Sequence, residues 1–136
     1  MTDKASRTIQ IAAALIDDSE GRLLLVRKAG TNCFMQAGGK IEDGESPTGA
    51  LRRELAEEIG LVLADGDVPY LGCYSAPAAN EPDHIVEAEV YHVRAPLDPV
   101  VQSEIAEAIW VDVPTALTLP LAPLTRDHIL PLFQRL

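Results

Sequence analysis

The sequence lacks the features that mark membrane-spanning, secreted and nucleic-acid-binding proteins. Its 136 residues contain no apolar run near the ~18 residues that cross a bilayer, and the opening MTDKASRTIQ has no apolar signal stretch. Lys and Arg number 11 against 21 Asp and Glu, a net charge of -10, and they form no basic stripe. We therefore expect a cytoplasmic protein that has no membrane contact and binds no nucleic-acid duplex.

Cysteine and histidine are also scarce. Cys33 and Cys73 form neither a CxxC pair nor a disulfide framework, so we expect packed, reduced thiols. His84, His92 and His128 are scattered without the spacing of metal ligands. No serine or cysteine lies in a nucleophile motif, and the glycines form no P-loop or dinucleotide fingerprint. Covalent catalysis is therefore not indicated.

The length and the order of apolar segments predict one domain over residues 1–136 that mixes strands and helices, an α/β fold. A chain of this size buries one core, and 47% of its residues are apolar. We expect a hairpin of strands 8–16 and 22–27, a long loop over 31–46, a helix over 47–59, strands at 68–75, 84–93 and 108–111, and a closing helix over 125–136 with Pro131 inside it.

The helix over 47–59 has the clearest boundaries. Ser46 supplies an N-cap hydroxyl ahead of a proline, and Gly60 is a typical C-terminal stop. Leu51 and Leu55 lie four residues apart and begin an apolar stripe that continues through the last turn. We expect this stripe to face the core and the polar faces to carry any chemistry.

Acidic side chains are concentrated on that helix. Glu54, Glu57 and Glu58 stand at positions i, i+3 and i+4, so they share one face and repel one another. A divalent cation would cancel this repulsion, and carboxylate oxygens suit Mg²⁺ or Mn²⁺. Such an ion would also let an acidic protein bind an anionic substrate. From these residues alone, a solvated acidic face is the other interpretation.

The acidic triplet belongs to a longer pattern. The stretch reads Gly39, five residues, Glu45, seven residues, Arg53-Glu54-Leu55, one residue, Glu57-Glu58, one residue, Gly60-Leu61. It resembles the signature of the MutT-like Nudix hydrolases at every restricted position. The resemblance implies an α/β/α sandwich with a mixed central sheet, and a catalytic loop-helix-loop at about 38–61. It also implies a pyrophosphohydrolase that cleaves a nucleoside triphosphate or another nucleoside diphosphate derivative through attack of metal-activated water on phosphorus.

The same resemblance assigns roles within this region. The implied ligands of the divalent ions are Glu54, Glu57 and Glu58, with the backbone carbonyl of Gly38. Glu45 and Arg53 are implied to form a charged pair that ties the loop to the helix and orients the ligands. The family commonly adds a carboxylate from a distant loop, as a ligand or base. Glu104 is the best match here, and Glu107 is the next.

The substrate is less constrained than the reaction. Arg27, Lys28 and Lys40 lie beside the implied catalytic loop and are expected to contact phosphate, unless they are ordinary solvated residues. For the base, we consider Phe34, Met35, Tyr74, the loop Asn80-Glu81-Pro82 and Trp110; each of these could instead pack in the core. ADP-ribose or nucleotide-sugar hydrolysis is an alternative activity, and a nucleotide-binding domain without turnover is another. Homodimers are common in the family.

Overall fold

The computed structural model describes residues 7–64, 68–96 and 98–136. The strands are β1 (Thr8–Asp17), β2 (Leu23–Lys28), β3 (Phe34–Met35), β4 (Ala37–Lys40), β5 (Tyr70–Pro77), β6 (Ile85–Arg94) and β7 (Ile105–Val111). The helices are α1 (Pro47–Ile59), α2 (Val113–Ala116), the π-helical turn η2 (Thr125–Ile129) and α3 (Leu130–Arg135).

The strands of the described residues form one mixed sheet. Its order is β3-β2-β1-β6-β5, with β4 paired to β1 and β7 paired to β2. The long β1 and β6 run parallel over their whole length, from Thr8 opposite Ile85 to Asp17 opposite Arg94, and the other pairs are antiparallel. The mixed central sheet implied by the sequence is confirmed.

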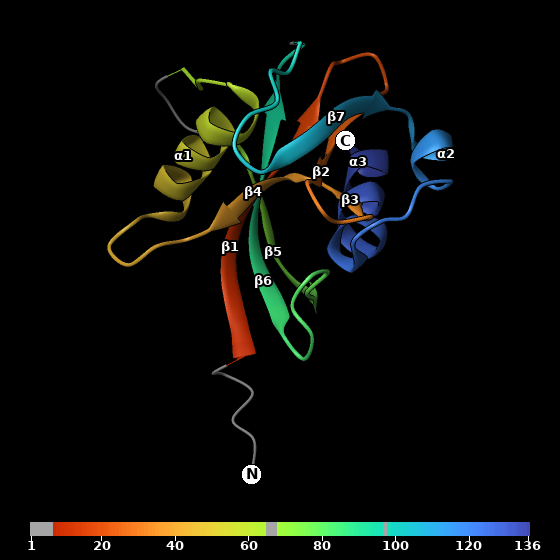
Figure 1. The fold of residues 1–136 in the computed structure, drawn as a ribbon. Helices are drawn as coiled ribbons and strands as arrows, with labels where there is room; N and C mark the ends of the chain where they lie inside the picture. Colours follow the sequence, from red (N-terminus) through yellow and green to blue (C-terminus); the bar gives the residue numbers. More distant parts are fainter. Residues whose placement is uncertain (1–6, 65–67, 97) are drawn as a thin grey trace.

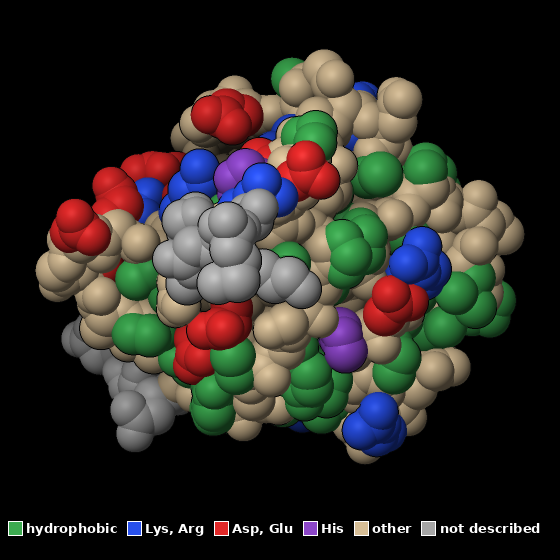
Figure 2. Space-filling model, turned by 90° about the horizontal axis from the view of Figure 1, so that it is seen from below, with side chains coloured by type: hydrophobic (Ala, Val, Ile, Leu, Met, Phe, Trp, Pro, Cys, Tyr) green, Lys and Arg blue, Asp and Glu red, His purple; other side chains and the backbone are tan. Residues whose placement is uncertain are grey.

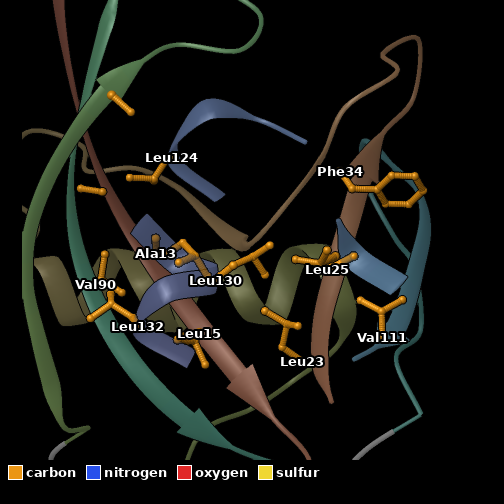
Figure 3. Packing of buried hydrophobic residues seen from close by; sticks show 14 residues of the cluster. Ala13, Leu15, Leu23, Leu25, Phe34, Val90, Val111, Leu124, Leu130 and Leu132 are labelled. Carbon is orange, nitrogen blue, oxygen red and sulfur yellow. The ribbon is translucent and has the colours of Figure 1, made fainter. Parts of the chain in front are cut away.

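Helices cover both faces of this sheet, which confirms the α/β/α sandwich (Figure 1). Alternate residues of β1 point to opposite faces. Ala12 and Ala14 pack in the cluster that includes Leu51 and Leu55 of α1. Ala13 and its neighbours two positions along pack instead against the C-terminal helices, and Figure 3 shows Leu124, Leu130 and Leu132 in this second cluster. We call these two clusters the α1 face and the α3 face.

The expected hairpin of strands 8–16 and 22–27 exists only at its turn. β1 and β2 are paired at Asp17 and Leu23, and β1 then continues beside β6 and β4. The run from Ala12 to Ile16 is fully buried, as in the central strand of a sheet covered on both faces. Its neighbours are therefore distant in sequence.

The prediction of one long loop over 31–46 is wrong in part, because this stretch contains β3 and β4. Gly38 and Gly39 have low strand propensity, but they pair with Ala13 and Ala12 of β1. Pairing with a buried central strand outweighs that propensity. The predicted closing helix over 125–136 is present, but it begins as the π-helical turn η2, and Pro131 lies directly after that turn, at the start of α3.

The surface carries charges of both signs. Figure 2 shows acidic and basic side chains intermingled on the face seen from below. No helix in the described part of the chain is long and apolar enough to cross a membrane.

Candidate active site

The helix α1 has the boundaries that its sequence predicts. The Ser46 hydroxyl accepts a hydrogen bond of 3.0 Å from the Gly49 N–H, and Gly60 ends the helix with a φ of 70°. Leu51 and Leu55 are fully buried against the sheet. This anchoring fixes the rotation of the helix, so the faces that carry the glutamates are directed toward β4 and the solvent.

Arg53 connects the loop before α1 to the helix. Its Nε and Nη2 donate to both carboxylate oxygens of Glu45, at 2.7 and 2.9 Å, and Nη2 also donates to the Lys40 carbonyl at 3.0 Å. The Arg53 hydrogen bonds lower the pKa of Glu45 to about 2, aided by a backbone hydrogen bond at Glu42. The pair expected between Glu45 and Arg53 is confirmed.

The third nitrogen of the same guanidinium reaches the glutamates of the helix. Arg53 Nη1 donates to Glu54 Oε1 at 2.8 Å and lies 3.6 Å from Glu57 Oε2. One cation therefore holds two of the three clustered carboxylates and reduces their repulsion. Only 16% of the Glu54 side chain is exposed, against 54% for Glu57.

Glu58 is the buried member of the triplet. Its residue is 7% exposed, and its Oε1 accepts a hydrogen bond of 3.1 Å from the Gly38 N–H. Burial raises the pKa of Glu58 to about 7, and the charges of Glu54 and Glu104 act in the same direction against the opposing effects of Gly38 and Lys28. A buried carboxyl with a raised pKa, placed beside other carboxylates, is typical of a functional site.

The two glycines of β4 allow this close packing. A side-chain carbon at Gly39 would lie 2.4 Å from the carboxyl carbon of Glu54. At Gly38, which has a φ of 142°, it would lie 2.2 Å from the Ala12 carbonyl oxygen. Only glycine leaves the space that the Glu54 carboxylate occupies above the strand.

A distant segment brings a fourth carboxylate to the same place. The N–H groups of Val100 and Gln102 donate to the carbonyls of Ile59 and Glu58, at 3.1 and 3.0 Å, so this segment folds back over the end of α1. The carbonyl of Glu104 accepts from Ala29 at 2.7 Å, which anchors the segment to the end of β2 as well. Glu104 consequently lines the same pocket as the helix glutamates.

That pocket has a volume of about 450 Å³ and two chemically different ends. The acidic end is lined by Glu54, Glu57, Glu58 and Glu104, with Lys28 close enough to act on Glu58, and Lys40 is a further lining residue of the pocket. The apolar end is lined by Ile9, Ile11, Val86 and Leu124, and the loop 77–81 closes one side. Met35 also lines the pocket but packs against the α1 face. An anionic group held through cations would find complementary surface at the acidic end. A flat apolar group would find it at the apolar end.

Residues 7–133 match the family described as the NUDIX domain. The chain belongs to the Nudix family. Nudix hydrolases act on phosphoric anhydride bonds, and the names of two curated relatives, an 8-oxo-dGTP diphosphatase and a CTP pyrophosphohydrolase, agree with this reaction class. The implied MutT-like resemblance and the enzyme class are thus confirmed.

Individual Nudix relatives differ in length. An octanoyltransferase of Myxococcus xanthus is 39% identical over 115 residues, covering 82% of this chain but only 32% of that protein. An 8-oxo-dGTP diphosphatase of Haemophilus influenzae is 31% identical, covering 78% of this chain and 77% of that protein. The crystal structure of a MutT Nudix hydrolase from Burkholderia pseudomallei is 25% identical, with a TM-score of 0.71, covering 90% of this chain and 95% of the other.

The Nudix pocket does not receive all the residues that the sequence suggested. Lys28, Lys40, Met35, Asn80 and Glu81 line it. The described lining does not include Pro82, Arg27, Phe34, Tyr74 or Trp110.

Four of the five residues outside the lining have another role. Arg27 donates to Glu107 at 2.8 Å across the β2–β7 pair, so the second choice for a distant carboxylate is a structural partner. Phe34 is 8% exposed and belongs to the buried cluster of the α3 face. Tyr74 packs against this cluster, and its hydroxyl donates to the Leu71 carbonyl. Trp110 packs against the α1 face. Alternation along the strands turns these rings toward the core.

Apart from Met35, sequence reasoning missed the apolar lining. Ile9, Ile11 and Val86 come from the ends of β1 and β6, and Gln36 and Leu124 lie beside them. Apolar residues near strand ends carry no local signal for a ligand. For Gln36 the sequence offered only its position two residues before a glycine pair, and its burial, with 7% exposed, becomes visible in the structure.

The donor set of the acidic end fits a hard divalent ion. Carboxylate oxygens of three residues in adjacent turns of α1 face a glycine strand, and Gly39 leaves room for one of them. In the part of the chain that the structure describes, no three acidic, histidine or cysteine side chains already converge as a complete ligand set. Arg53 holds Glu54 and Glu57, and Glu58 is bound to Gly38, so side-chain rotation must precede coordination.

Proposed function

We propose that this protein is a Mg²⁺-dependent pyrophosphohydrolase, with Mn²⁺ able to replace Mg²⁺, that cleaves a nucleoside triphosphate or another nucleoside diphosphate derivative. The observation that carries the proposal is the two-ended pocket, in which four carboxylates and two lysines face an apolar surface. The acidic end suits a metal-bound diphosphate, and the apolar end suits a base. The relative named as an 8-oxo-dGTP diphosphatase supports a triphosphate substrate.

Glu54, Glu57 and Glu58 would hold the divalent ions, with the Gly38 carbonyl as a further ligand. When bound, such ions neutralise phosphate oxygens and lower the pKa of a coordinated water. This explains how a chain with a net charge of -10 accepts a polyanion.

The remaining charged residues would orient the metal ligands or neutralise the charge of the phosphates. Arg53 sets the orientation of Glu54 through a hydrogen bond of 2.8 Å, while its contacts with Glu45 keep the guanidinium in place. Lys28 and Lys40 project from β2 and β4 into the pocket, where each ammonium group can bind phosphate oxygens. A carboxylate oxygen of Glu104, free of the helix, would accept the proton of the attacking water.

A hydrolysis panel tests the proposal. Nucleoside triphosphates, including oxidised ones, ADP-ribose, nucleotide sugars and dinucleoside polyphosphates are incubated with millimolar Mg²⁺, with Mn²⁺ or with EDTA, and the products are separated by chromatography. We expect release of a nucleoside monophosphate that stops in EDTA. Release from ADP-ribose or a nucleotide sugar alone would replace the triphosphate proposal, and binding without turnover would make the protein a nucleotide-binding domain.

A further inference from the structure

Gln36 is a buried amide at the wall of the pocket. Its residue is 7% exposed, and it connects β3 to β4 directly before the glycine pair. The hydroxyl of Thr125, which is fully buried, donates to Gln36 Oε1 at 2.7 Å. This hydrogen bond occupies the amide oxygen and fixes the direction of the Nε2 group.

The wall around Gln36 is held at several points. The Phe34 N–H donates to the Pro120 carbonyl at 2.8 Å, and the Ala122 N–H donates to the Phe34 carbonyl at 3.0 Å. Phe34 and Leu121 thus form a short parallel bridge. Two backbone hydrogen bonds join β3 to the segment before η2, and the Thr125–Gln36 hydrogen bond joins the first residue of η2 to the residue after β3, so the amide is preorganised.

Gln36 lies at the apolar end of the pocket. Phe34 belongs to the α3 face and Ala37 to the α1 face, and strand alternation places Gln36 with Phe34. Ile11 and Val86, which line the same pocket, also pack against the α3 face. The glutamates of α1 approach from the opposite face of the sheet.

The Nε2 group of Gln36 has two N–H donors, and the hydrogen bonds among the described residues give it no protein acceptor. No buried side-chain polar atom of the described residues lacks a partner, so Nε2 is open to the pocket that Gln36 lines rather than enclosed by protein. A donor in such a place is satisfied by water or by a ligand that fills the pocket. Of the side chains that line the pocket, those of Ile11, Val86 and Leu124 are apolar and offer no acceptor.

We propose that Gln36 is a specificity-determining residue that donates a hydrogen bond to a carbonyl oxygen of the substrate's base. This inference rests on the proposed function, because it assigns the apolar end to the base of the same nucleotide. A base that carries a carbonyl oxygen satisfies the Nε2 donors, whereas an exocyclic amino group at that position presents a donor to a donor. Thr125 is the positioning residue, since its hydroxyl keeps Nε2 directed into the pocket.

Paired substrates that differ at one position test this assignment. Inosine and adenosine triphosphates differ by a 6-oxo or a 6-amino group, and uridine and cytidine triphosphates by a 4-oxo or a 4-amino group. We expect the wild-type enzyme to favour the oxo member of at least one pair about 10- to 100-fold in kcat/KM, the range of one good hydrogen bond to a base edge.

Two variants of Gln36 give opposite expectations. Gln36→Glu keeps the size and the acceptor for Thr125 but directs a carboxylate oxygen into the pocket, so the oxo/amino ratio should invert. Gln36→Met keeps the length and removes the donors without adding charge, so the ratio should fall to about 1. Ratios that stay at the wild-type value in both variants, with melting temperatures unchanged, would overturn the proposal.

Thr125 provides the matched control. Thr125→Val has the same shape but no hydroxyl, so the amide can rotate and the ratio should fall, while Thr125→Ser restores the hydroxyl and the ratio. A purely structural role would lower stability in Thr125→Val without moving the ratio.

A binding measurement separates failure of this inference from failure of the proposed function. Calorimetry compares inosine and adenosine monophosphates, and uridine and cytidine monophosphates, on the wild-type and Gln36→Glu proteins. If no nucleotide is hydrolysed but the oxo preference in binding is inverted by the variant, the hydrolase proposal fails and the role of Gln36 stands. If the wild-type protein hydrolyses nucleotides with no oxo preference in either pair, or binds no monophosphate and hydrolyses no nucleotide, the role of Gln36 is refuted.

Discussion

The two ends of the pocket are built in different ways. The acidic end takes three of its four carboxylates from one helix, within five residues of sequence, and the fourth from the segment folded over the end of that helix. The apolar end takes its side chains from β1, from β6, from the residue between β3 and β4 and from the segment before η2, which span most of the chain. Local sequence therefore determines most of the acidic end, and tertiary structure determines the apolar end.

The ends also differ in how far they are prepared for a ligand. At the acidic end, Arg53 and Gly38 occupy the carboxylates, so these groups would have to exchange partners to bind the proposed metal ions. At the apolar end, Leu124 belongs to the buried cluster of the α3 face (Figure 3), and Gln36 is clamped by Thr125. Rearrangement upon binding is accordingly expected at the acidic end only.

Substitution of Glu57 should produce the largest effect and should act at the acidic end alone. Glu57→Gln keeps the size of the side chain but removes a proposed metal ligand that is half exposed, so turnover should fall by about 10² or more while the fold stays intact. Steady-state kinetics on the best substrate of the panel, with a thermal melt of each protein, measures both quantities.

The matched control removes one negative charge elsewhere. Glu20→Gln changes an exposed glutamate in the turn between β1 and β2, so its turnover should equal that of the wild-type enzyme. If Glu57→Gln also retained wild-type turnover, the assignment of α1 as the metal-binding helix would be wrong.

The acidic end was predictable because the sequence features that indicate it lie in one stretch of the chain. The cap at Ser46, the stop at Gly60 and the signature between them appear in one stretch, and the structure places α1 with the expected boundaries. The pair of Glu45 and Arg53 also follows from this stretch and forms as expected. Capping and helix periodicity act over a few residues, so one sequence suffices to find them.

The apolar end was not predictable because its residues become neighbours only through strand pairing. Ile11 and Val86 lie 75 positions apart in the sequence. On the parallel strands β1 and β6, Ile11 is opposite Ala88, which is two residues after Val86. Aromatic rings were a poor guide to this end: Phe34 was a candidate either to stack on a base or to pack in the core, and it packs in the buried cluster of the α3 face. Residue type alone does not distinguish a ring that packs in the core from one that binds a ligand.

Replacing Arg53 should give the next largest effect, again at the acidic end. Arg53→Lys keeps the charge but loses the two parallel hydrogen bonds to Glu45, together with the shared contact to Glu54. Because such supporting partners usually contribute 10- to 100-fold, we expect kcat to fall by about that factor. A higher KM with an unchanged kcat would instead place Arg53 in direct contact with substrate.

At the apolar end, truncation should change binding more than turnover. Val86→Ala removes two methyl groups from the pocket wall, a loss of about 1 kcal/mol or about fivefold in KM, with kcat unchanged. The neighbouring Ile85→Ala is the control, since Ile85 is 39% exposed and lies outside the described lining of the pocket. Equal effects of the two substitutions would show that the wall at Val86 does not contact substrate.

The smallest expected effect is the response of the ligand-free protein to Mg²⁺. Binding to the folded carboxylates with a dissociation constant of about 1 mM would stabilise the protein by about 1 kcal/mol at a few millimolar Mg²⁺, or about 3 °C in melting temperature. The shift should shrink in Glu57→Gln and persist in Val86→Ala, because the ion interacts with the acidic end only. Equal shifts in wild type and Glu57→Gln would place the ion elsewhere. If the wild-type shift grows when a nucleoside diphosphate is added, phosphate oxygens complete the ligand set that Arg53 otherwise holds apart.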